Sequence, residues 1–218
     1  NQRSRRMRSE LRQRVVDALR IQERLRSELD CLESDDVFVT FLPGSGLTPG
    51  DFADSRPLLR QSLVAACAAV ETYLGDKVMQ QVGPLLKSEA SLTPRLSTLS
   101  LSLGDWMYIE HGYQRKRWGL REIVVESFVR ENSSTAPSKV GAMLSLVGVD
   151  GWAKQLDTHR KVKGGDTVAV LERITARRNR IAHEGDRVGR GRAALTVDEV
   201  KTDLVSLESI VDAIEAVV

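Results

Sequence analysis

Apolar residues recur every three or four positions along much of the chain, which is the spacing of amphipathic α-helices. Between residues 5 and 34 the steps alternate between four and three, with a polar interruption at Gln22. This pattern is typical of a short coiled coil, or of a helix that packs on its own domain. A second series predicts a helix over residues 56–80, with Pro57 in its first turn. Its apolar positions are Leu59, Leu63, Cys67, Val70, Leu74 and Val78.

The middle of the chain predicts shorter helical elements. Residues 83–104 are broken by proline and glycine and predict short helical turns. Helices are expected over residues 118–131 and 139–148. Asp150 is placed to cap the start of a further helix that reaches about Lys161.

The last third of the chain carries clear signals for helix ends. Residues 166–184 predict a helix, and Gly185 stands where a left-handed C-cap belongs. Residues 187–192 read as a flexible basic loop. Thr196 and Glu199 have the spacing of a capping box, which opens a last helix reaching about Val217.

Together these elements predict an all-α fold with three parts. A long N-terminal helix (residues 1–34) serves for packing or dimerisation, a linker rich in glycine and proline follows (35–55), and a helical bundle occupies residues 56–218. The linker contains Gly44-Ser45-Gly46 after an extended stretch. A dinucleotide site is disfavoured, because the third glycine comes one place late and Pro49 obstructs the helix that such a site needs.

Composition excludes several classes of protein. Aromatic residues make up only 5% of the chain, which disfavours aromatic-rich β-folds. No apolar run approaches the roughly 20 residues of a membrane span, and no signal segment is recognisable. Cys31 and Cys67 are far apart and read as unpaired thiols, so we expect a cytoplasmic protein. The histidines lack metal-ligand spacing, so neither a metal nor a cofactor is expected.

Charge is unevenly distributed towards the C-terminus. Residues 154–192 contain eleven Lys and Arg against five Asp and Glu, a local charge of +6, whereas residues 193–218 carry −5. A basic segment beside an acidic helix indicates either an anion-binding face or two surfaces that neutralise each other.

The helix over 166–184 carries a basic residue on its apolar stripe. Leu171, Ile174 and Ile181 are spaced by three and seven, and Arg178 occupies the position that completes the stripe. A guanidinium at such a position needs a partner or a cleft. Glu71, close to the apolar face of the helix over 56–80, is a candidate partner that would orient Arg178.

Arg178, Asn179 and His183 are candidates for phosphodiester chemistry. Asn179 and His183 share a helix face, and the long Arg178 side chain can reach around to the same anion. A guanidinium binds phosphate oxygens through two donors, and an imidazole exchanges protons near neutral pH. Alternatively, the basic residues of this segment have only a structural role, because cations near a helix C-terminus also complement the helix dipole.

A resemblance to a known family favours the chemical interpretation. The string Arg177-Arg178-Asn179-Arg180-Ile181-Ala182-His183-Glu184-Gly185-Asp186 resembles the C-terminal signature of HEPN domains, and is most similar to the RiboL-PSP-HEPN branch. Residues 62–74, in which Glu71 precedes an aromatic residue, and residues 147–152 also resemble segments of that family. The likeness covers about residues 56–217.

The resemblance implies an all-helical domain that commonly dimerises. Many HEPN members are metal-independent RNA endonucleases in toxin–antitoxin or defence systems, so Arg178 and His183 would be the catalytic pair, with Asn179 beside them. We expect Arg177, Arg180 and Arg187 to bind RNA. The expected partners are RNA, a second copy of the chain and an antitoxin or inhibitor protein.

The sequence is compatible with a second function and with two sources of a second catalytic group. Other HEPN members only bind RNA, a nucleotide or a protein partner, so a non-catalytic module is the alternative function. A second histidine for catalysis would come from a two-fold dimer, or from His111 of the same chain.

Overall fold

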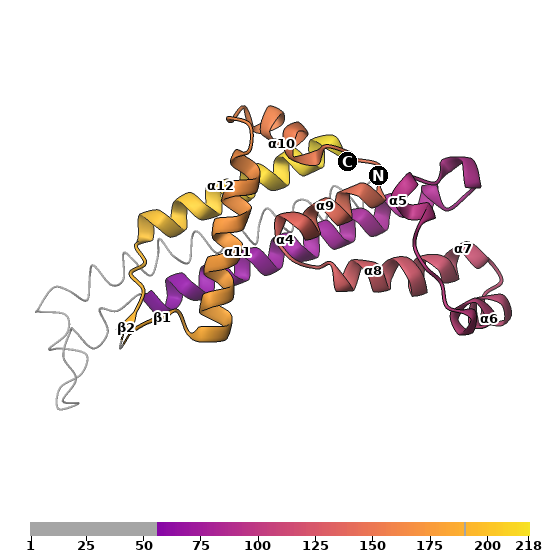
Figure 1. Cartoon of the computed structure of the whole chain (residues 1–218), viewed down its shortest axis with the longest axis horizontal. Coiled ribbons are helices and arrows are strands. Elements are labelled where there is room, and N and C mark those ends of the chain that lie inside the picture. Colours follow the sequence, from indigo (N-terminus) through magenta and orange to yellow (C-terminus); the bar gives the residue numbers. More distant parts are fainter. Residues whose placement is uncertain (1–55, 190) are drawn as a thin grey trace, which may run out of the picture. The chain divides into compact units, whose positions relative to one another are not determined.

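The computed structural model describes residues 56–189 and 191–218, and this part of the chain is almost entirely helical (Figure 1). The all-α prediction is therefore confirmed. The predicted N-terminal helix, the linker and Cys31 lie outside the described residues. In chain order the elements are α4 (Arg56–Leu85), the 3₁₀ turn η1 (Glu89–Ser91), α5 (Pro94–Ser97), α6 (Leu103–Gly112), α7 (Lys116–Gly119), the π-helical segment η2 (Leu120–Val125), α8 (Glu126–Glu131), α9 (Pro137–Leu146), α10 (Trp152–Arg160), α11 (Asp166–Glu184), β1 (Arg187–Val188), β2 (Gly191–Arg192) and α12 (Val197–Val217).

The chain divides into two compact units. Of the described residues, the motif unit comprises 56–69 and Arg177–Glu208, and the larger unit comprises Val70–Ala176 and Ser209–Val218. Helices α4, α11 and α12 contribute residues to both.

The apolar spacing of α4 corresponds to its buried side. In the motif unit Leu59, Leu63 and Cys67 are buried, and in the larger unit the buried positions continue every three or four residues. All six apolar positions predicted for this helix are buried. The helix runs five residues beyond the predicted end, and Pro84 is its last residue but one, where proline removes a single backbone hydrogen bond.

The predicted helix over 118–131 begins two residues earlier and changes type along its length. Helix α7 continues directly into the π-helical η2 and then into α8. Gly119 at the first junction is buried, and a Cβ there would lie 2.8 Å from Cγ2 of Ile109. Only glycine permits this close approach between α6 and α7.

Two local predictions were wrong. Helix α10 begins at Trp152, and its N-cap is Gly151 in a left-handed conformation (φ 63°) rather than Asp150. Residues 187–188 and 191–192, predicted to lie in a loop, pair as two short antiparallel strands, with Arg187 opposite Arg192 and Val188 opposite Gly191. Gly189, directly after β1, has a positive φ of 58°, which tight hairpin turns favour.

The predicted ends of α11 and α12 are confirmed. Gly185 adopts a left-handed φ of 60° directly after the last residue of α11. At the start of α12 the Glu199 backbone N–H donates to Thr196 Oγ1 at 3.2 Å, and the Thr196 N–H donates to Glu199 Oε2 at 2.8 Å. This reciprocal pair is the predicted capping box.

Candidate functional site

The Arg–His motif (residues 177–186) occupies the last two turns of α11 and the turn that follows. Asn179 and His183 are exposed, and Arg178 is half-buried. The Arg178 Nη1 group donates to Asn179 Oδ1 at 3.0 Å. Asn179 and His183 are four residues apart in an unbroken helix, so they share a face. An amide and an imidazole are therefore accessible together, beside a guanidinium that contacts the amide.

The last residue of the motif is a buried aspartate that holds the turn after α11 in place. Asp186 is 1% exposed and has a left-handed φ of 59°. Its Oδ2 accepts hydrogen bonds from Arg60 Nε of α4 at 2.9 Å and from Arg177 Nη2 of α11 at 2.8 Å. Its backbone N–H donates to the Arg180 carbonyl at 2.9 Å. The turn after His183 is thus connected to two helices through one side chain.

The same two guanidiniums also bind the chain after the hairpin. Arg60 Nη2 donates to the Ala193 carbonyl at 2.6 Å, and Arg177 Nη2 donates to the Ala194 carbonyl at 2.8 Å. Two arginines around one carboxylate leave one net positive charge in this cluster. Arg60 is 5% exposed, so the cluster orders the motif unit from within. Removing one partner of such a buried network costs about 3–5 kcal/mol.

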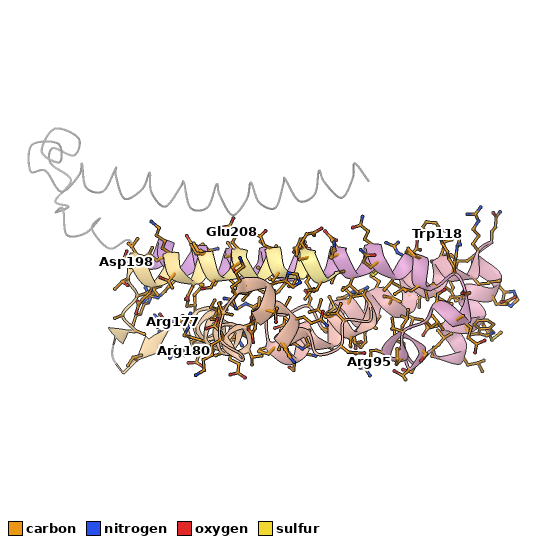
Figure 2. The ribbon with its side chains drawn as sticks, turned by 90° about the horizontal axis from the view of Figure 1, so that it is seen from above. Arg95, Trp118, Arg177, Arg180, Asp198 and Glu208 are labelled. Atoms are coloured by element: carbon orange, nitrogen blue, oxygen red, sulfur yellow. The ribbon has the colours of Figure 1, made fainter. Side chains whose placement is uncertain are left out.

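The three arginines predicted to bind RNA differ in their surroundings. Arg180 and Arg187 are exposed, and neither forms a side-chain ion pair within the described residues. Arg177 is half-buried, and its guanidinium donates hydrogen bonds to the Asp186 carboxylate and the Ala194 carbonyl. Figure 2 shows Arg177 and Arg180 projecting from α11. Arg177 therefore positions the turn, while RNA binding by all three residues stays a prediction.

Glu71 has a partner that the sequence does not indicate. It is half-buried in the larger unit, where its Oε1 accepts a hydrogen bond from the Thr135 backbone N–H at 3.1 Å. Arg178 belongs to the motif unit. The predicted Arg178–Glu71 pair stays a prediction.

The other candidate groups lie outside the motif. His111 is exposed in the last turn of α6, and His159 is exposed on α10. Cys67 is buried and forms no disulfide with another described residue. Among the described residues, no cluster of His, Cys, Asp and Glu has the arrangement of a metal site, and no helix has the length and hydropathy to cross a membrane.

Sequence reasoning missed the roles of Arg60 and Asp186. The available signal was Gly185-Asp186 directly after a helix, since aspartate tolerates the left-handed region and bonds to nearby backbone. Nothing in the sequence pairs Asp186 with Arg60, which is 126 residues away.

Comparison with known proteins finds no matching family model, no matching curated protein and no matching solved structure.

Proposed function

We propose that this protein is a metal-independent RNA endonuclease of the HEPN type, in which Arg178 and His183 are the catalytic residues. The proposal is supported mainly by the accessibility of the motif. Asn179 and His183 are exposed on one face of α11, and Arg178 donates a hydrogen bond to Asn179. An arginine and a histidine sealed in a core would be incompatible with a polymeric substrate.

The proposed reaction is attack of a ribose 2′-hydroxyl on the adjacent phosphorus. The new P–O2′ bond forms as the P–O5′ bond breaks, which leaves a 2′,3′-cyclic phosphate and a 5′-hydroxyl. A base takes the proton of the 2′-hydroxyl, and an acid protonates the departing 5′-oxygen. His183 fills one of these roles, and His183 of a second copy fills the other. Arg178 stabilises the charge that builds on the phosphate oxygens.

The surroundings of the motif support this assignment. The buried Asp186 cluster holds the end of α11 in one conformation, and catalytic groups depend on such pre-organisation. Exposed Arg180 and Arg187 supply positive charge near the motif in sequence, as a phosphate backbone requires.

Replacement of His183 tests the proposal directly. We expect His183→Ala to reduce cleavage of a structured RNA in EDTA at least about 100-fold, because general acid–base catalysis contributes roughly 10²–10⁴-fold. The melting temperature should change by less than about 2 °C, since an exposed side chain is removed. Cleavage is followed on denaturing gels, and His159→Ala, another exposed histidine, is the control that should retain full activity.

Arg178→Lys provides a second line of evidence. It should also fail to cut, because a point charge does not replace the two-donor guanidinium. Undiminished cutting by His183→Ala would refute the assignment of His183. A wild-type chain that binds RNA in EDTA without cutting it would support the alternative, a non-catalytic HEPN module.

A further inference from the structure

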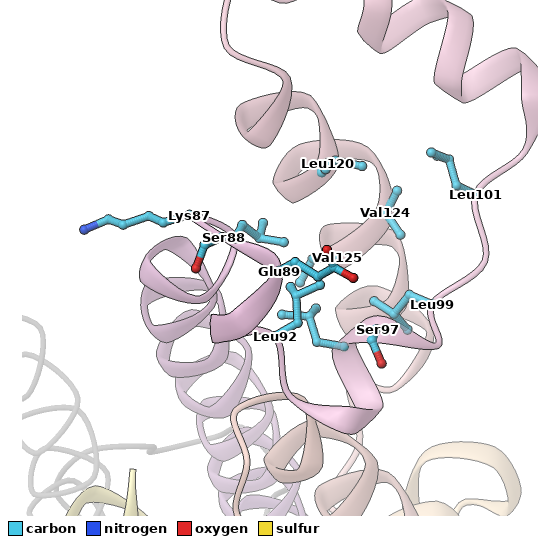
Figure 3. A pocket seen from close by; sticks show the side chains of 12 residues that line it. Lys87, Ser88, Glu89, Leu92, Ser97, Leu99, Leu101, Leu120, Val124 and Val125 are labelled. Atoms are coloured by element: carbon cyan, nitrogen blue, oxygen red, sulfur yellow. The ribbon is translucent and has the colours of Figure 1, made fainter.

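The apolar pocket of the larger unit does not extend the proposed active site. It has a volume of about 420 Å³ and is lined by the segment after α4, by α5 and its flanks, and by η2 (Figure 3). Most of its lining residues are leucine or valine, and none is a histidine or an arginine. The pocket therefore supplies none of the groups that the proposed reaction uses, in contrast to the buried charges of the motif unit.

Within the motif unit, the backbone of Asp186 links the end of α11 to the two short strands. Its N–H donates to the Arg180 carbonyl at 2.9 Å, and its carbonyl accepts from the Ala193 N–H at 2.9 Å. The first hydrogen bond closes a loop of chain that contains His183. The second adds one pair to the ladder between β1 and β2. Asp186 is thus the junction between the proposed catalytic histidine and the strands that follow it.

The side chain of Asp186 connects this junction to two helices. One carboxylate oxygen, Oδ2, accepts hydrogen bonds from Arg60 of α4 and from Arg177 of α11. Asp186 is 1% exposed and Arg60 5%, and all three residues belong to the motif unit. An RNA strand cannot reach a carboxylate buried in this way. Any effect of Asp186 on cleavage therefore passes through the groups that it holds.

This junction contains features that lower the stability of the fold. Asp186 has a left-handed φ of 59° directly after Gly185, whose φ is 60°. Asp186 Oδ1 and Arg177 Nε are buried and form no hydrogen bond with another described residue. Left-handed residues other than glycine and unpaired buried polar atoms are both unfavourable, and they concentrate at functional sites. Their place three residues after His183 favours a role in positioning that side chain.

His183 lies where a helix is least constrained. It is the last residue but one of α11. The last four carbonyls of an α-helix have no partner within the helix, and the last turn frays unless other contacts hold it. An imidazole that transfers a proton during the reaction has to be placed closely, since a displacement of about 1 Å can reduce the rate about 100-fold.

We infer, given the proposed nuclease function, that Asp186 is a positioning residue for RNA cleavage and that Arg60 acts through it from α4. The carboxylate is held by guanidiniums of two helices. It fixes the left-handed turn that closes the end of α11, and this turn places His183. Asp186 and Arg60 thereby affect the rate of cleavage without contacting RNA.

Asp186→Asn tests the role of the carboxylate. Asparagine also tolerates the left-handed region, so the substitution removes the charge and keeps the backbone preference. At saturating RNA, kcat should fall at least tenfold. KM should change less than threefold, because the two guanidiniums keep their hydrogen bonds to the carbonyls that follow β2. The melting temperature should fall by roughly 6–20 °C, so rates are measured where circular dichroism shows the variant fully folded.

Asp203→Asn is the matched control. Asp203 lies on α12 and is the other buried aspartate among the described residues of the motif unit. Its substitution should also lower the melting temperature, but kcat should stay within twofold of wild type. Hydrogen exchange separates the two variants further. The backbone amides of residues 183–186 should exchange at least tenfold faster in Asp186→Asn and at the wild-type rate in Asp203→Asn.

Arg60→Gln tests whether α4 contributes to the same effect. It leaves Arg177 and Asp186 as a neutral pair, so it should fold even if Asp186→Asn does not. We expect kcat to fall at least threefold. In the double variant with Asp186→Asn, kcat should lie less than twofold below that of Asp186→Asn alone, because Arg60 acts through the carboxylate.

Several outcomes would overturn the inference. Full kcat in folded Asp186→Asn would do so, as would an equal loss of kcat in Asp203→Asn. If Asp186→Asn does not fold, full kcat in Arg60→Gln decides against it. Losses that multiply in the double variant would overturn the assignment of Arg60. A wild-type chain that does not cleave RNA would overturn both proposals, whereas an active wild type with a fully active Asp186→Asn overturns only this one.

Discussion

Asp157 anchors the start of α11 through one buried carboxylate. Its Oδ2 accepts a hydrogen bond from the Gly165 N–H at 2.7 Å, and its Oδ1 accepts one from the Thr167 N–H at 2.9 Å. Burial alone would raise the pKa of Asp157. The hydrogen bonds from Thr167 and Gly165 and the charge of Arg160 outweigh it, so the pKa of this carboxyl lies below its ordinary value.

Asp157→Asn is expected to destabilise the protein in a pH-dependent way. The amide cannot accept both hydrogen bonds, so the free energy of unfolding should fall by about 1–3 kcal/mol at pH 7. A carboxyl with a lowered pKa stabilises the fold above its ordinary pKa of 3.8, and this contribution is lost as the pH falls through the folded value. The difference between wild type and variant should therefore shrink below about pH 4.

Urea denaturation at pH 7 and pH 3 measures this difference. Asp150→Asn, at an exposed aspartate seven residues away, is the control and should leave stability nearly unchanged. An equal loss of stability at both pH values would show that the charge of Asp157 contributes nothing.

At the scale of elements, α9 and α10 approach closely because one position lacks a side chain. A Cβ on Gly141 of α9 would lie 2.5 Å from Nε1 of Trp152, the first residue of α10. An indole ring is rigid, so it has to move as a whole to make room. Thr93 makes a second connection to α9, since its Oγ1 donates to the Leu146 carbonyl at 2.9 Å while also capping α5.

Gly141→Ala should therefore lower the free energy of unfolding by about 1–3 kcal/mol, the usual cost of overpacking. Each kcal/mol corresponds to roughly 2–4 °C in a protein of this size, so thermal denaturation resolves the effect. Gly112→Ala serves as the control, because no atom lies within 4 Å of its added Cβ and alanine favours the helix. A Gly141→Ala protein as stable as wild type would mean that Trp152 repacks without cost.

Short-range patterns made most of the elements predictable. The bounds of α11 and the last residue of α12 match the prediction, as do the glycine cap and the Thr196–Glu199 box. These features depend on residues fewer than five positions apart. Gly151 replaced the predicted cap at Asp150 because a left-handed residue directly before Trp152 already turns the chain into α10.

At the scale of the whole molecule, the proposed nuclease requires two copies of the motif. If each active site needs His183 from both copies, a mixed dimer of wild type and His183→Ala is inactive. With random exchange, adding an equal amount of His183→Ala to a fixed amount of wild type should reduce cleavage to about half, since wild-type dimers form in proportion to the square of their fraction.

Cleavage rates after prolonged co-incubation test this prediction. His159→Ala should not inhibit when added in the same way. Unchanged cleavage after full exchange, verified by mass spectrometry of tagged chains, would mean that each chain acts alone.

The accessible part of the candidate site could be predicted from the sequence, because it depends on local geometry. Asn179 and His183 are four residues apart in a predicted helix, and they are exposed on one face as expected. The buried support could not be predicted in this way. Asp186 and Arg60 are 126 residues apart, and Glu71 and Thr135 are 64 apart.

The sequence by itself determined the all-α class, the buried side of α4 and the ends of the last two helices, since helical periodicity and capping act over a few residues. Only the tertiary structure decided which charged groups meet in the Asp186 cluster and that Leu103, Trp106 and Met107 of α6 are exposed. A periodic pattern shows that a helix has an apolar side. What covers that side depends on contacts between segments far apart in the chain, which local spacing does not encode.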